Sequence, residues 1–176
     1  MGVRRIGCYL LVSLIYLSAC YSAHSGTGVK PAEKPGAKVL AEFPILYTHP
    51  LPGFQLRLPP SWKRFRVCQK TTIWPLGIKA ITVYFCLPTR DKSWSGEVSG
   101  YANLFALTFF SSDQYRRLKD LQAKGKGDVY EEIVSFAHNR QYHVHYSTGQ
   151  ACPSDLEARM AEAGRIVETF RFQKGK

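Results

Sequence analysis

The chain has 176 residues, of which 45% are hydrophobic and 13% are aromatic. This composition excludes an intrinsically disordered chain, since such chains have too little apolar surface to build a core, and the length suits a single domain. Lysine and arginine total 24 against 13 acidic residues, which gives a net charge of +11. The basic residues are scattered, so we favour a solvated basic surface and expect no nucleic-acid partner. Affinity for acidic lipid head groups is the alternative.

The N-terminus has the order of charge and hydrophobicity that is typical of a signal peptide. Arg4 and Arg5 precede a largely apolar run that extends from Ile6 to Leu17. This run is well short of the roughly 20 residues that a membrane-spanning helix needs. We therefore expect residues 1–19 to be a signal peptide that is removed.

The end of the apolar run, Leu17-Ser18-Ala19-Cys20, resembles the lipobox of bacterial lipoproteins. This resemblance implies that Cys20 is acylated and becomes the first residue of the mature protein, held on a membrane by its acyl chains. Tyr21 follows in place of the aspartate that often retains lipoproteins at the inner membrane. The expected location is therefore the bacterial cell envelope, at the outer membrane and facing the periplasm. An ordinary secretory signal with an incidental cysteine is the alternative.

Residues 20–42 contain serine, glycine and proline with few large apolar side chains. Such a composition favours a flexible linker between the lipidated cysteine and a folded domain over residues 43–176.

Within this domain, alternation of apolar and polar residues predicts a first strand over 54–58, ended by Pro59 and Pro60. A second strand is expected over 64–70 and a third over 78–87, joined by a turn at Trp74-Pro75-Leu76-Gly77. A polar loop over 89–100 then leads to a strongly apolar strand over 103–110. Because both faces of that strand are apolar, we expect it to be central and covered on both sides.

The C-terminal part is predicted to contain two helices and two strands. Ser111, Ser112 and Asp113 cap an amphipathic helix that ends at 124–127. Strands are expected over 129–137 and 141–147, with a tight turn between them. Pro153 opens the second helix, which carries an apolar stripe from Leu156 to Phe170.

The cysteines suggest one possible disulfide. A hairpin centred on Gly77 would place Cys68 directly opposite Cys86, and facing Cβ atoms in an antiparallel pair are about 4.5 to 5.5 Å apart. Two interpretations remain open: a bridge between Cys68 and Cys86, or a different register in which these two and Cys152 are buried thiols.

The order of elements resembles the PsbP-like domain, which also occurs in DcrB-like lipoproteins. The resemblance rests on Gly53-Phe54-Gln55-Leu56-Arg57-Leu58-Pro59 followed by Ser61-Trp62, and on a late helix from Cys152-Pro153 to Thr169-Phe170-Arg171-Phe172. It implies an α+β fold in which a single antiparallel β-sheet is flanked by α-helices on both faces. Members mostly act as binding, assembly or chaperone-like modules, so no catalytic residue is transferred from the family.

Candidate site residues are few. His143 and His145 share one face of a predicted strand, and a tight turn would bring His138 near them, which makes these three weak candidates for a zinc or copper site. The chain contains no Gly-x-Ser-x-Gly elbow, Walker loop or His-Glu-x-x-His motif. Cys152 fits a capping or packed thiol better than a nucleophile. We therefore expect no metal, no cofactor and no enzymatic activity.

These patterns favour a lipid-anchored accessory module that binds an envelope protein assembly. The alternative is a carrier or sensor of a small anionic or lipidic ligand. A further alternative is an enzyme or metal-binding protein that uses Cys152 or the histidines. An apolar pocket between sheet and helix would favour the carrier. A flat exposed aromatic patch would favour the accessory module.

Overall fold

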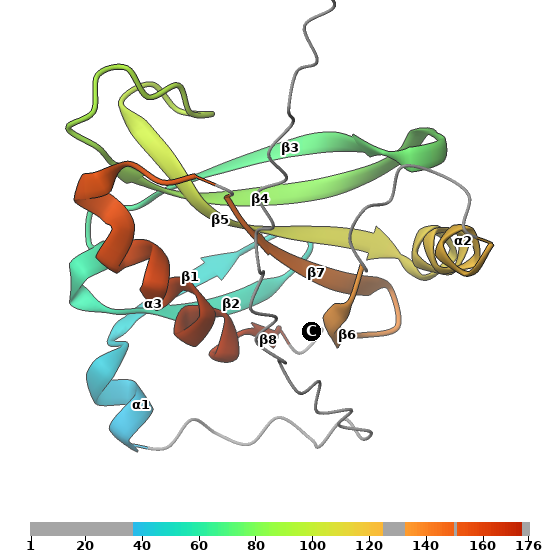
Figure 1. Ribbon diagram of the computed structural model, residues 1–176. Helices are drawn as coiled ribbons and strands as arrows, with labels where there is room; N and C mark the ends of the chain where they lie inside the picture. Colours follow the sequence, from blue (N-terminus) through green and yellow to red (C-terminus); the bar gives the residue numbers. More distant parts are fainter. Residues whose placement is uncertain (1–36, 125–132, 150, 174–176) are drawn as a thin grey trace, which may run out of the picture. The chain divides into compact units, whose positions relative to one another are not determined.

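The computed structural model describes residues 37–124, 133–149 and 151–173. The strands of this part form two antiparallel sheets, one with three strands in the order β1-β2-β8 and one with five in the order β3-β4-β5-β7-β6 (Figure 1). Our prediction of a single antiparallel sheet flanked by helices on both faces was therefore wrong. A second sheet occupies much of the space where helices were expected.

The three-stranded sheet consists of β1 (Ile45–His49), β2 (Phe54–Leu58) and β8 (Arg171–Phe172). The bounds of β2 confirm the predicted strand, which alternates buried and half-buried side chains along its length. β1 pairs with the whole of β2, whereas β8 pairs only with Phe54 and Gln55. A turn that includes Gly53, whose φ of 77° suits glycine, joins β1 to β2.

The five-stranded sheet is built from a long hairpin, a central strand and a short second hairpin. Its strands are β3 (Arg66–Trp74), β4 (Ile78–Pro88), β5 (Tyr101–Ser111), β7 (Tyr142–Thr148) and β6 (Ser135–His138). β5 lies in the middle and is buried along almost its whole length, which confirms the predicted central strand. Part of the strand predicted over 129–137 lies outside the described residues.

Three α-helices and three short 3₁₀ turns complete the described part. The helices are α1 (Ala37–Glu42), α2 (Ser112–Ala123) and α3 (Glu157–Glu168), and the turns are η1 (Pro60–Trp62), η2 (Pro75–Gly77) and η3 (Ser154–Leu156). α1 occupies the end of the stretch in which we expected a flexible linker. The predicted cap of α2 is confirmed: Ser111 accepts from the backbone N–H of Gln114, whose side chain accepts from the N–H of Ser111.

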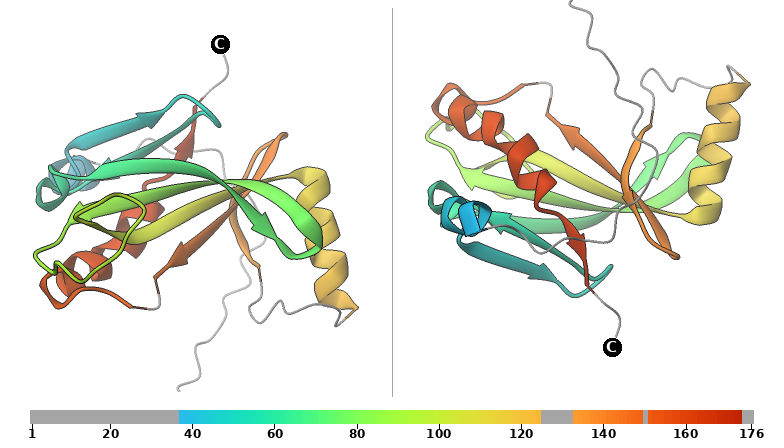
Figure 2. Two further views of the ribbon diagram at one scale, coloured as in Figure 1. Left: turned by 90° about the horizontal axis from the view of Figure 1, so that it is seen from above. Right: turned by 90° about the horizontal axis from the view of Figure 1, so that it is seen from below.

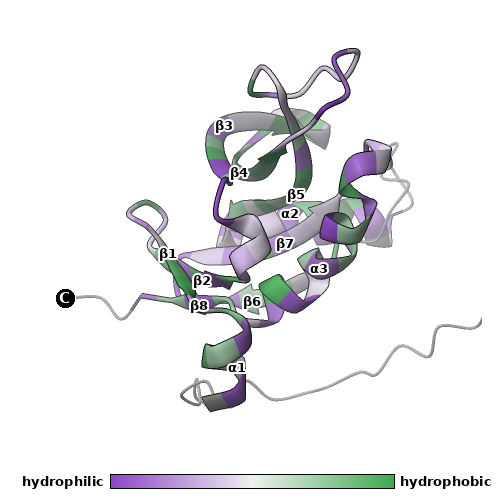
Figure 3. Ribbon diagram, turned by 90° about the vertical axis from the view of Figure 1, so that its left-hand side faces the viewer, coloured by the Kyte–Doolittle hydropathy of each residue, from purple (hydrophilic) through white to green (hydrophobic). Residues whose placement is uncertain are grey.

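The helices lie on different parts of the five-stranded sheet. α3 and the three-stranded sheet lie on the same side of it, which we call the inner face, whereas α2 lies at the end that carries the tip of the β3–β4 hairpin (Figure 2). The loop between β4 and β5 projects from the sheet and is largely hydrophilic (Figure 3).

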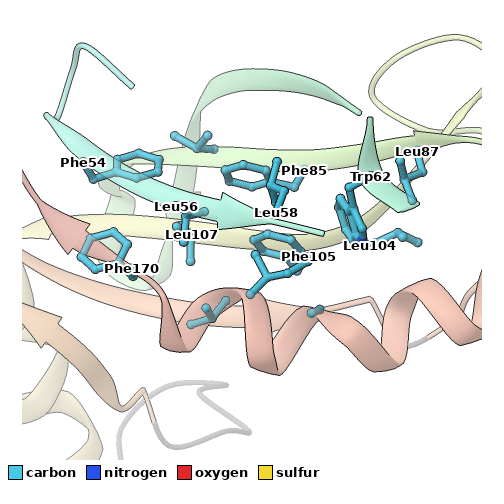
Figure 4. Close-up of a cluster of buried hydrophobic side chains, with 14 of the residues drawn as sticks. Phe54, Leu56, Leu58, Trp62, Phe85, Leu87, Leu104, Phe105, Leu107 and Phe170 are labelled. Atoms are coloured by element: carbon cyan, nitrogen blue, oxygen red, sulfur yellow. The ribbon is translucent and has the colours of Figure 1, made fainter. Parts of the chain in front are cut away.

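The main core lies against the inner face. It joins side chains of β2, β4 and β5 to α3 and the segments around them, as Figure 4 shows for Phe54, Leu56, Leu58, Trp62, Phe85, Leu87, Leu104, Phe105, Leu107 and Phe170. Trp62 has no exposed surface, and its indole Nε1 donates to Glu162 Oε2 on α3 at 2.8 Å. Phe85 and Phe105 stack at 4.5 Å between adjacent strands. All residues of this core lie between Phe43 and Phe170, within the compact unit 32–176, so that unit carries its own core.

A second, smaller core holds α2 on the opposite, outer face of the five-stranded sheet. It contains Ile78, Ala80, Phe110, Leu118 and Ile133, with Trp74 and Tyr115 packed against it. α2 is thus fixed at one end of the outer face, and further along this face the side chains of β3, β4, β5 and β7 line an open pocket.

Candidate binding site

Trp74 reaches across the outer face of the five-stranded sheet. It is the last residue of β3, yet its ring lies 5.0 Å from that of Phe110 on β5 and 5.8 Å from that of His145 on β7. Both contacts are edge-on, with interplanar angles of 80° and 86°. Adjacent strands in a flat sheet are about 4.8 Å apart, so these contacts require the β3–β4 hairpin to curl over the outer face.

A pocket of about 300 Å³ lies under this curl. Its lining comes from four strands and the hairpin turn: Thr72, Ile73, Trp74, Pro75, Thr82, Tyr84, Ala106, Thr108 and Ser147. The lining therefore combines hydroxyl groups with the ring of a tryptophan and with small apolar side chains. This mixture suits a ligand that has both hydrogen-bonding groups and an apolar face.

The polar lining is tied together by a chain of threonine hydroxyls. Thr82 Oγ1 lies 2.7 Å from Thr72 Oγ1 and 3.0 Å from Thr108 Oγ1, so the chain crosses three strands. The Trp74 indole N–H donates to Thr72 Oγ1 at 3.1 Å, which extends the chain to the curled end of the hairpin. Thr82 and Thr108 are only 3% and 2% exposed, and burying such groups is tolerated because they bond to each other.

Tyr84 adds a phenol to the same lining. Burial, with smaller contributions from Cys68 and Cys86, raises its pKa, so the phenol stays protonated and able to donate at neutral pH. Lys70 stands opposite Thr82 and forms an ion pair with Glu97 of the β4–β5 loop. Arg66 lies over the ring of Tyr101 and donates to its hydroxyl at 3.1 Å.

The two candidate disulfide cysteines are close but do not face each other. The register of the β3–β4 hairpin pairs Cys68 with Tyr84 and Arg66 with Cys86, so the predicted register was wrong by two residues. Both thiols are free, and that of Cys86 lies 3.1 Å from Asn103 Oδ1. Burial, with a contribution from Cys68, raises the pKa of Cys86 to about 12.

The hairpin turn explains the error in register. Leu76 has a φ of 61° and Gly77 one of 67°, so the turn is centred one residue earlier than a turn built on glycine alone. A leucine in the left-handed region is uncommon, and sequence patterns do not favour it.

The three candidate histidines are only partly brought together. His138 and His143 are paired across β6 and β7 and stack at 5.4 Å, and His143 also stacks on Tyr115 at 4.2 Å. His145 turns toward Trp74, and its Nδ1 lies 3.2 Å from the carbonyl oxygen of Val134. Burial and the neighbouring His138 lower the pKa of His143. Within the described ranges, no three histidine, cysteine or acidic side chains are grouped to hold a metal ion.

Cys152 packs against the main core just before η3. Its thiol lies 3.4 Å from the carbonyl oxygen of Pro153. Burial, Glu157 and Asp155 all raise its pKa, which disfavours the thiolate that a nucleophile requires.

Cys20 and the predicted signal peptide lie outside the described residues. Among the residues that are described, no helix is long and apolar enough to cross a membrane.

Comparison with protein-family models, with curated proteins and with solved structures gave no match. The resemblances to the lipobox and to the PsbP-like domain therefore stay predictions.

The pocket was not predicted from the sequence because its residues are distant along the chain. Thr72, Thr82 and Thr108 meet only through the register of three strands. One signal was present in the sequence. Lys70, Thr72 and Trp74 recur at every second position of β3, as Thr82 and Tyr84 do on β4, so polar and aromatic side chains share one face of the sheet. Such alternation marks a face that is neither fully apolar nor freely solvated.

Proposed function

We propose that the protein is a non-enzymatic binding module of a bacterial cell envelope. In this proposal it is held at the outer membrane by acyl chains on Cys20 and faces the periplasm. It binds a small ligand in the pocket beneath Trp74. The observation that carries the proposal is the pocket itself, because its volume of about 300 Å³ lies at the lower end of the range for small-molecule sites.

The chemistry of the lining supports a ligand of mixed character. Buried hydroxyls of Thr82 and Thr108 form the floor, and the Trp74 ring and Pro75 offer apolar surface at the hairpin end. A purely hydrocarbon ligand would leave those hydroxyls without further partners, whereas a ligand with hydroxyl, carbonyl or carboxylate groups would bond to them. This favours the carrier or sensor hypothesis, with a site on the outer face of the sheet and not between sheet and helix.

An accessory role in a protein assembly is the second candidate. It is supported by apolar side chains at β6, the edge strand of the five-stranded sheet. Val134, just before β6, is 55% exposed, and Phe136 on β6 is 40% exposed. An exposed edge with apolar side chains offers both unpaired backbone groups and buriable surface to a protein partner.

Native mass spectrometry tests the leading proposal. The protein is extracted from the envelope of its host and sprayed with its bound molecules. We expect a small adduct on the native protein and its loss in Ser147→Trp, because the indole fills the pocket from β7. The matched control is Ala161→Trp on the exposed surface of α3, which should keep the adduct. An adduct that survives Ser147→Trp, or a native protein without one, would contradict the proposal.

A further inference from the structure

The tip of the β3–β4 hairpin exposes large apolar side chains. Ile73 is 75% exposed and Leu76 is 61% exposed, on either side of Trp74 and Pro75. Leu76 has a positive φ within the tight turn. Ile73 near the end of β3 and Leu76 in the turn thus place two large aliphatic side chains in water at this end of the hairpin.

Cations surround this tip. Lys79 is exposed at the start of β4, and the amide Nε2 of Gln114 on α2 donates to its carbonyl oxygen at 2.7 Å, so α2 lies beside the tip end of the hairpin. α2 and the hairpin tip lie at the same end of the five-stranded sheet in every view (Figures 1 and 2). α2 carries exposed Arg116 and Arg117.

Among the described residues, the carboxylates at this end offset only part of the charge. Asp113 lies 3.0 Å from Arg116 in a well-exposed pair. Asp120 is the other acidic residue of α2, which also carries Lys119. Lys79 and Arg117 have no ion pair within the part of the chain that the structure describes, so their charges are available to an anionic surface.

We infer that this end of the domain docks on an anionic lipid bilayer. Ile73 and Leu76 enter the boundary between head groups and acyl chains, while Lys79 and Arg117 lie among the lipid phosphates. An apolar tip flanked by cations is the chemistry that such an interface selects, because apolar burial and attraction to anionic lipid add together. The contact would fix the orientation of the domain and bring the Trp74 side of the pocket toward the membrane.

Vesicle sedimentation tests this inference without the lipid anchor. The unacylated chain from residue 20 onward is mixed with vesicles of phosphatidylcholine, with or without phosphatidylglycerol. We expect binding to the vesicles that contain phosphatidylglycerol, and its weakening by salt. Replacing both apolar residues in Ile73→Ser/Leu76→Ser should weaken it roughly tenfold, since each loses apolar area that the bilayer would cover. Leu46→Ser, at a 50% exposed position on β1, is the matched control and should bind as the native chain does.

A second variant keeps the test independent of the hairpin. Arg117→Gln on α2 should lower the affinity about fivefold, because one cation near an anionic membrane contributes about that factor. Equal binding of the Ile73→Ser/Leu76→Ser and Leu46→Ser variants would overturn the inference. The inference would also be overturned if the native chain bound equally to vesicles with and without phosphatidylglycerol, or if it bound a protein and no vesicles. None of these results bears on the small adduct in the pocket, so the two proposals fail separately.

Discussion

Trp74 of β3 contacts His145 of β7 edge-on at 5.8 Å, although two strands lie between them in the sheet order. The contact closes the hairpin over the outer face of the five-stranded sheet. It also explains why the pocket exists, since a flat hairpin would leave Thr82 and Thr108 on an open surface.

Trp74→Ala should release the end of the hairpin. The substitution removes the contacts to Phe110 and His145 and the hydrogen bond to Thr72. We expect a loss of about 2 kcal/mol in the free energy of unfolding, below the range for fully buried aromatics because Trp74 is half-buried. Urea unfolding measures the loss, and hydrogen exchange should quicken along the hairpin. The neighbouring Ile73→Ala, at an exposed position, should change stability by less than about 0.5 kcal/mol. Equal losses in the two variants would show that Trp74 does not hold the hairpin.

Thr82→Val should break the threonine chain with almost no change in side-chain shape. Thr82 bonds to both Thr72 and Thr108, and the buried hydroxyl of Thr108 would lose this partner. We expect a cost of about 1 to 2 kcal/mol in unfolding free energy. Thr71→Val, on an exposed position of β3, is the control and should have little effect. A stability for Thr82→Val that matches the control would mean that the hydroxyl chain contributes nothing.

Cys86 should resist alkylation in the folded protein. Its side chain is fully buried and its pKa is raised to about 12, so almost no thiolate reaches the reagent at pH 8. We expect iodoacetamide to modify Cys86 only after unfolding in denaturant, as measured by peptide mass spectrometry. A Cys68–Cys86 disulfide in the non-reduced digest would show that the register seen here is not that of the native hairpin.

The stability of the domain should fall on mild acidification through His49. Its side chain is 7% exposed and stacks on Phe54 at 5.1 Å, and burial lowers its pKa from 6.5. The native state therefore binds this proton less readily than the unfolded state. The contribution to stability is present above about pH 6.5 and is lost as the pH falls toward the lower native pKa. His49→Phe keeps the stack and should reduce the slope of stability against pH. An unchanged slope would exclude His49 as its source.

Local patterns predicted single elements well. The alternation of 54–58, with Pro59 behind it, gave β2 at its observed bounds, and the capping pair of Ser111 and Gln114 begins α2. β1 was missed because apolar and polar residue types do not alternate along it. Leu46 is apolar yet 50% exposed, and His49 is polar yet buried. That strand pairs with β2 apart from the other sheet, so missing it led to the wrong prediction of one sheet.

The register of the β3–β4 hairpin and the pocket could not be predicted from local sequence patterns. The register of the β3–β4 hairpin depends on the positive φ of Leu76, which nothing in the local pattern indicates. The pocket depends on that register and on the curl that carries Trp74 to His145. The candidate residues chosen by type, the cysteines and histidines, are therefore absent from the pocket lining, and its threonines were not predicted.

The central claim is that a small ligand binds beneath Trp74, and photo-crosslinking within the living envelope tests it most directly. Azidophenylalanine, which is close to tyrosine in size, replaces Tyr84 in the pocket lining or, as the control, Ala161 on α3. After irradiation, peptide mass spectrometry should find a small-molecule adduct at position 84 and none at position 161. The absence of a small adduct at position 84, or the same adduct at both positions, would contradict the account.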